Sequence, residues 1–189
     1  MSIIIFPPEW VGYLALKWKG MSMKHRDKKL QEEMDPAELC KYLEKECHEE
    51  IQSSVKKITH CFSEEPFQLQ NESAEELLQL LFSKLSDEVQ HVFLKESGIV
   101  FPLIRKSNTE AILEPRITDS IQLTQKVILN LLIKIRQLLN DFIPRPGSGK
   151  KWKACLNELF LLENKIHYWI HIEQSVLYPA ITRKKDIEV

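Results

Sequence analysis

Apolar side chains recur at intervals of three and four residues along four long segments of the chain, the spacing of helices that bury one face. The first segment opens with Asp35, Pro36 and Glu38, a cap residue, a first-turn proline and an acidic third position. We expect four helices, over residues 35–58, 73–100, 118–142 and 148–178, with Pro102 interrupting the second and Pro179 following the fourth. Helices of this length joined by short or medium loops predict an all-α fold, an antiparallel up-down four-helix bundle.

The bundle defines one domain over residues 35–183. Residues 1–34 form an N-terminal extension, which we interpret as a disordered segment or as a mis-assigned start, with translation beginning at Met21 or Met23. The alternative is an amphipathic arm that docks on a partner or a membrane. Residues 184–189 form a short polar tail.

Charge excludes several classes of partner. The 26 Lys and Arg residues balance 27 Asp and Glu residues, so no net field draws the chain to nucleic acid or to an anionic membrane. No apolar run approaches the roughly 20 residues of a membrane span.

The four cysteines show no paired metal-binding spacing and follow no secretory signal, which indicates a cytoplasmic protein with reduced thiols. Hydrolase and transferase motifs are also missing from the sequence, so nothing indicates an enzyme.

A short repeat carries the chemical signal. Residues 96–102 and 173–179 share one pattern: glutamate, two small or polar residues, two aliphatic residues, an aromatic residue and proline. At about 100° per residue, Glu96 lies at the middle of the apolar stripe of its helix, and Glu173 lies among the apolar residues of the fourth helix. We therefore expect both carboxylates in the core.

Two carboxylates in one core are costly unless a proton or a cation compensates them. Bundles that bind two iron or manganese ions use inward-facing Glu side chains from different helices together with His. The alternative is a protonated or hydrogen-bonded Glu pair. Without a cation, we expect at least one of the two groups to have a pKa raised toward neutrality.

Several stretches resemble hemerythrin-like proteins of the repair-of-iron-centres (RIC) group, whose bundles carry a non-haem di-iron site. The resemblance rests on the two Glu-to-Pro repeats, on residues 42–48 with His60 after them, on residues 135–144 and on residues 151–154, and it covers about residues 37–181. It implies a hemerythrin-like bundle, iron as the cofactor, and iron handling in the repair of iron–sulfur clusters under nitrosative or oxidative stress.

The ligand positions that the resemblance implies are only partly occupied. Val92 and Trp169 stand where the family motif has histidines, and Gln125 replaces a third. The metal ligands that remain are Glu96, Glu173, His60 and Cys47, with His48, His167 and His171 as outer participants. We expect Val92, Gln125, Trp169 and Cys47 to cluster around the two glutamates and to refill the space of a metal pair.

Three functions follow. The first is a divergent RIC-like protein with a lost or reduced di-iron centre and a binding or regulatory role, with a protein partner in iron–sulfur repair or a homodimer. The second is a mononuclear metal-binding protein. The third is a helical adaptor without metal.

Overall fold

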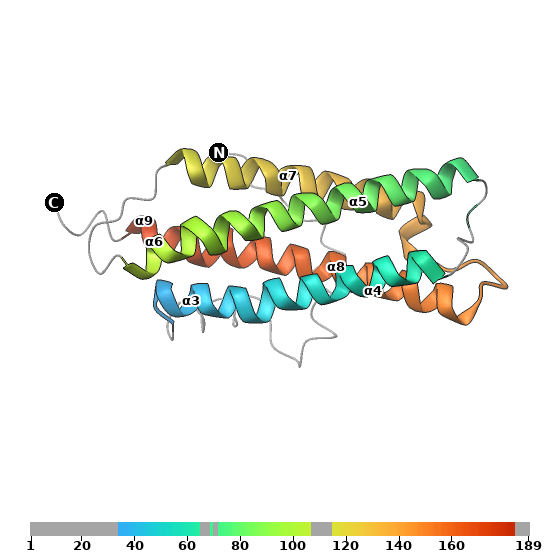
Figure 1. Cartoon of the computed structure of the whole chain (residues 1–189), viewed down its shortest axis with the longest axis horizontal. Coiled ribbons are helices and arrows are strands. Elements are labelled where there is room, and N and C mark those ends of the chain that lie inside the picture. Colours follow the sequence, from blue (N-terminus) through green and yellow to red (C-terminus); the bar gives the residue numbers. More distant parts are fainter. Residues whose placement is uncertain (1–33, 65–68, 70–71, 107–114, 184–189) are drawn as a thin grey trace.

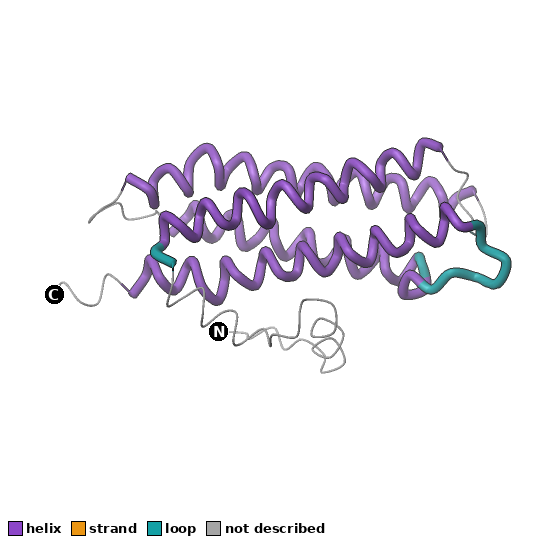
Figure 2. Tube along the Cα trace, turned by 90° about the horizontal axis from the view of Figure 1, so that it is seen from below, coloured by secondary structure: helices purple, strands orange, loops and turns teal. Residues whose placement is uncertain are grey.

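Four long helical rods lie side by side in the computed structural model, which describes residues 34–64, 69, 72–106 and 115–183 (Figures 1 and 2). No strand occurs within these ranges, so the all-α prediction is confirmed. The interpretations of residues 1–33 and of the polar tail concern residues outside this description. Among the helices that the structure describes, none combines the length and apolar character that a membrane crossing needs.

The first rod consists of α3 (Pro36–Tyr42), a π-helical turn η1 (Leu43–His48) and α4 (Glu49–Glu64). Asp35 caps it as predicted: its carboxylate accepts a hydrogen bond of 2.8 Å from the backbone N–H of Glu38. The helix runs about two turns beyond the predicted end at Ile58.

The second and fourth rods have the same construction. The second contains α5 (Glu72–Lys95), η2 (Glu96–Val100) and α6 (Phe101–Lys106), and the fourth contains α8 (Lys150–Ile172), η4 (Glu173–Leu177) and α9 (Tyr178–Arg183). In each, a π-helical turn begins at the repeated glutamate and is followed directly by an α-helical segment.

The expected interruption at Pro102 and end before Pro179 are therefore wrong, because the helix continues through both prolines. Proline lacks an N–H and its ring clashes with the carbonyl four residues back. Here the preceding N–H groups, of Phe101 and Tyr178, reach five residues back to the carbonyls of Glu96 and Glu173. Each proline thus follows a wide turn in which the hydrogen-bond register has already shifted, and the helix accommodates it.

The third rod is α7 (Pro115–Leu138), and it ends earlier than predicted. Residues Asn140–Phe142 form a 3₁₀ turn, η3, with positive φ angles of 48°, 59° and 62°. Arg136 stabilises this turn, since its guanidinium donates to the Asp141 carboxylate at 3.2 Å and lies 5.0 Å from the centre of the Phe142 ring.

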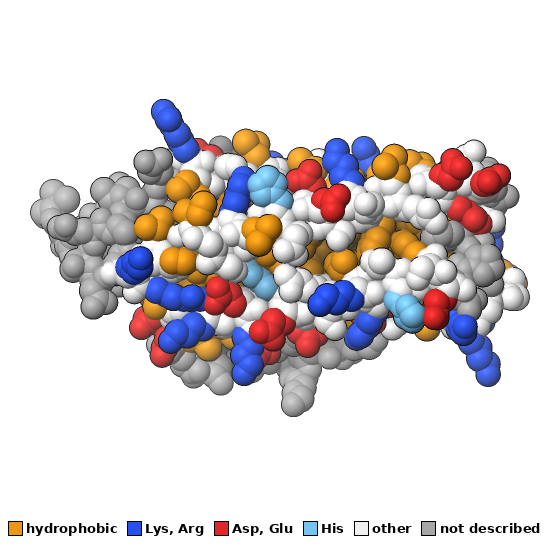
Figure 3. All heavy atoms as spheres, viewed as in Figure 1, with side chains coloured by type: hydrophobic (Ala, Val, Ile, Leu, Met, Phe, Trp, Pro, Cys, Tyr) orange, Lys and Arg blue, Asp and Glu red, His pale blue; other side chains and the backbone are white. Residues whose placement is uncertain are grey.

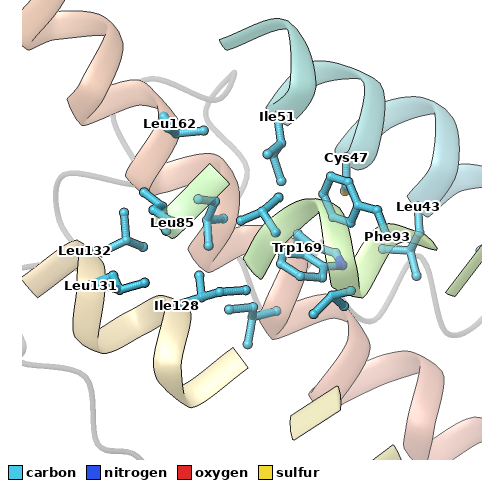
Figure 4. Packing of buried hydrophobic residues seen from close by; sticks show 14 of the residues in the cluster. Leu43, Cys47, Ile51, Leu85, Phe93, Ile128, Leu131, Leu132, Leu162 and Trp169 are labelled. Carbon is cyan, nitrogen blue, oxygen red and sulfur yellow. The ribbon is translucent and has the colours of Figure 1, made fainter. Parts of the chain in front are cut away.

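All four rods contribute to one core. α5 packs along α7, α4 packs along α8, and α3 contacts α6 and η4 at the end where those segments lie. Figure 4 shows buried side chains from every rod meeting between the helices: Leu43, Ile51, Leu85, Phe93, Ile128, Leu131, Leu132, Leu162 and Trp169. The face seen in Figure 3 carries basic and acidic side chains interspersed, in keeping with the balanced charge of the chain.

Candidate metal centre

Both repeated glutamates are inside the bundle, as predicted: Glu96 and Glu173 have 0% of their surface exposed. Each is the first residue of a π-helical turn, and His48, which is 5% exposed, is the last residue of the third such turn. π-Helical turns are rare in proteins and frequent at functional sites. Three of them carry His48, Glu96 and Glu173, which meet in this core.

His48, Glu96 and Glu173 form a compact cluster in which one potential ligand atom of each lies within 4.8 Å of the others. Nε2 of His48 lies 2.9 Å from Oε2 of Glu96. The imidazole is stacked on the Phe93 ring, with centroids 3.8 Å apart and planes inclined by 15°. This stacking fixes the orientation of the ring and directs Nε2 toward the carboxylates.

Gln125 of α7 orients one of the carboxylates. Its amide nitrogen donates to Oε2 of Glu173 at 2.5 Å, and its amide oxygen accepts from Gln174 at 3.0 Å. With both ends of the amide engaged, Gln125 acts as a hydrogen-bond donor to the cluster. The indole of Trp169, fully buried, lies beside both carboxylates and lowers the pKa of each.

Several polar atoms at the centre of the cluster lack an aligned hydrogen-bond partner although they are buried. They are Nε2 of His48, both carboxylate oxygens of Glu96, Oε1 of Glu173 and the indole nitrogen of Trp169. Unsatisfied buried groups of this kind are uncommon in folded proteins and are costly. Here four of the five atoms belong to His48, Glu96 and Glu173, whose potential ligand atoms lie within 4.8 Å of one another.

Burial controls the protonation of the cluster. It raises the pKa of Glu173 to about 7, an effect that contacts with Glu96, Trp169 and Gln125 partly oppose. It raises the pKa of Glu96 well above the ordinary value, and the charge of Glu173 raises it further. Burial also lowers the pKa of His48 to about 3. The imidazole is therefore neutral at physiological pH and has a lone pair to offer, and the expected raised carboxyl pKa is found for both glutamates.

These residues fit a single metal cation. A neutral imidazole and two carboxylates are ligands for divalent transition metals, and a cation would relieve both the repulsion and the desolvation of the carboxylates. Three ligands suit one ion. Val92 is apolar and Gln125 is engaged, so the adjoining positions do not supply the ligands of a second ion.

Cys47 and His48 exchange the roles that the sequence analysis assigned to them. Cys47 is buried and close enough to Glu173 and Glu96 for their charges to raise the pKa of its thiol, which burial brings to about 12. It is nevertheless outside the compact cluster and lines a pocket of about 280 Å³ with Glu46, Glu50, Lys165 and Tyr168. Residues of a π-helical turn each advance by a smaller angle than in an α-helix. His48 therefore faces the direction that an uninterrupted α-helix would give to Cys47.

The other three candidate histidines lie outside the cluster. His60 is on the solvent face of α4, with 70% of its side chain exposed and Nε2 3.3 Å from Glu64. His167 is half-buried, and burial and the charge of Arg136 lower its pKa to about 4. Nδ1 of His171 lies 3.3 Å from the hydroxyl of Ser175. His60 is a candidate metal ligand only through the resemblance, and the structure does not bring it to the glutamates.

No protein-family model matches the chain, and no curated protein matches it. The cluster and the helical fold are thus the observations on which a function must be argued.

Proposed function

We propose that the chain is a divergent hemerythrin-like protein of the RIC type, an antiparallel up-down bundle with a reduced metal centre. In this proposal one divalent ion, iron by the resemblance, is held by His48, Glu96 and Glu173. The protein then serves iron handling in the repair of iron–sulfur clusters in the cytoplasm, with a protein partner or as a homodimer. The observation that carries the proposal is the buried cluster of three potential ligand atoms within 4.8 Å of one another.

The residues around the cluster have separable roles in this proposal. Glu96 and Glu173 supply the negative charge that a divalent ion requires, and His48 supplies a neutral nitrogen. Gln125 holds Glu173 in place, as hydrogen-bonded partners of metal ligands commonly do. Phe93 packs against the imidazole and keeps water away from it. When bound, iron would supply Lewis-acid and one-electron chemistry.

A specific contact favours a second candidate, a metal-free protein with a binding or regulatory role. The carboxyl groups of Glu96 and Glu173 interact directly with each other, an arrangement that a shared proton stabilises. In that case the cluster is a structural remnant of a metal site and the surface of the bundle performs the function.

Metal analysis separates the two candidates. The protein is purified without a metal-affinity tag, reconstituted with Fe²⁺ under reducing conditions, passed through a desalting column and analysed for bound metal. We expect about one ion per chain. His48→Ala should lose this metal, whereas the matched histidine variant His60→Ala should retain it, because His60 is exposed on α4.

Two results would count against a single-ion centre. Two irons per chain with the absorption bands of an oxo bridge would mean that further ligands complete a di-iron site. No bound metal in a well-folded wild-type protein, with equal behaviour of both histidine variants, would favour the metal-free candidate.

A further inference from the structure

Cys61 and Cys155 form a thiol pair between two helices of the bundle. Cys61 lies in the last turn of α4 and Cys155 in the second turn of α8. Cys155 is 3% exposed and belongs to the core, while Cys61 is half-buried and packs against its edge. The thiol of Cys61 is close enough to raise the pKa of the Cys155 thiol, and both are free cysteines.

The register of the two helices independently brings these positions together. The contacts of α4 shift from a later to an earlier residue of α8 as α4 advances. Lys165 lies 3.0 Å from Glu50 and 2.8 Å from Ser54, whereas Glu158 lies 2.7 Å from Ser54 and 3.9 Å from Lys57. One further helical turn along α4, and one turn back along α8, places Cys61 opposite Cys155.

This pair is electrostatically separate from the metal centre. Burial is the main cause of the raised pKa of Cys155, and the thiol of Cys61 and the charge of Glu158 add to it. The charges of Glu96 and Glu173 raise the pKa of Cys47 but are not among the causes for Cys155.

We propose that Cys61 and Cys155 are a peroxide-sensitive pair that forms a reversible disulfide between α4 and α8. The half-exposed Cys61 reacts first: its sulfur attacks one oxygen of the peroxide, the O–O bond breaks, and a sulfenic acid and one water form. The sulfur of Cys155 then attacks the sulfur of Cys61. The S–O bond breaks, the S–S bond forms, and the hydroxyl leaves with the Cys155 proton as a second water. The two thiols lose two electrons and the peroxide gains them.

The cross-link has a definite place in the fold. It joins the end of α4 to the beginning of α8, at the end of the bundle opposite α3 (Figure 1). The loop that it closes contains the whole of α5 and α7. Closure of so long a loop restricts the unfolded chain strongly, so the oxidised protein should be more stable than the reduced protein.

Peptide mapping of the oxidised protein tests the proposal. The full chain is treated with hydrogen peroxide, alkylated without reduction, digested and analysed by mass spectrometry. We expect a peptide joining Cys61 to Cys155 within one chain, its disappearance with dithiothreitol, and a higher melting temperature of the oxidised form.

Two variants serve as matched tests. Cys61→Ser should lose both the cross-link and the peroxide-induced rise in melting temperature, with circular dichroism confirming that it folds. Cys40→Ala should keep both effects, since Cys40 lies on α3 away from this end of the bundle. Oxidation of Cys61 to a sulfinic acid with Cys155 unmodified, or a disulfide only between two chains, would overturn the proposal.

Discussion

Replacement of Glu173 by glutamine offers a direct measure of the buried carboxyl pair. Glutamine has the size of a protonated glutamic acid and keeps an oxygen that can accept from Gln125, but it does not ionise. In protein freed of metal with a chelator, the substitution removes the group whose ionisation opposes folding.

The size and sign of the effect follow from the pKa of Glu173. This pKa is about 7 in the fold against 4.5 for an ordinary glutamate, and each pH unit corresponds to about 1.4 kcal/mol. Because the folded pKa is raised, the stabilising contribution is complete below pH 4.5 and is lost as the pH rises toward 7, about 3 kcal/mol in all. In the variant, the charge of Glu173 no longer raises the pKa of Glu96. Ionisation of Glu96 then opposes folding less, so the free energy of unfolding of the variant depends still less on pH.

Thermal and denaturant melts at pH 5 and pH 8 provide the assay. The free energy of unfolding of Glu173→Gln, relative to wild type, should be roughly 2 to 3 kcal/mol higher at pH 8 than at pH 5. This difference corresponds to about 5 to 10 °C in melting temperature. Glu76→Gln, at an exposed position on α5, is the matched control and should show no such difference. If Glu173→Gln in chelated protein is no more stable relative to wild type at pH 8 than at pH 5, then ionisation of Glu173 does not destabilise the fold. With a metal bound, the sign reverses, and the variant should lose stability and metal together.

Three substitutions test the packing and the helix ends. Trp169→Ala should lower the free energy of unfolding by about 3 to 5 kcal/mol, because it empties a fully buried site, and a loss below about 1 kcal/mol in urea melts would contradict the packing. Asp35→Ala should cost about 1 kcal/mol through loss of the helix cap, measured in the same melts, and an unchanged midpoint would deny the cap that role. Arg136→Ala should lower the free energy of unfolding by about 3 kcal/mol, because it leaves the buried Glu163 carboxylate without its ion pair. Lys134→Ala, on the exposed face of the same helix, is the control, and an equal loss of stability in the two variants would refute the argument.

Local patterns were sufficient for much of the architecture. The cap at Asp35, the period of the apolar residues and the positions of the loops predicted four helices in the correct order, with ends in error by one or two turns. The burial of Glu96 and Glu173 also follows from the period, because both sit within the apolar stripe of a long helix. These features depend on residues close together in sequence.

The choice of His48 over Cys47 depended on the path of the backbone. A count of about 100° per residue assumes an uninterrupted α-helix and leaves out the π-helical turn that begins at Leu43. That turn rotates every later side chain of the first rod about the helix axis. One signal was present in the sequence: both repeated glutamates precede a proline by six residues, and a helix that continues through proline needs an adjustment of this kind.

The sequence by itself thus determined the number and kind of the helices and the inward direction of the two glutamates, because hydrophobic period and capping act within one helix. Only the tertiary structure decided which side chains meet. The pairing of His48 with Glu96, the contact of Gln125 with Glu173 and that of Cys61 with Cys155 each join different rods. Such contacts depend on the rotation and axial register of packed helices, and these are set by the fit of whole side-chain surfaces to one another.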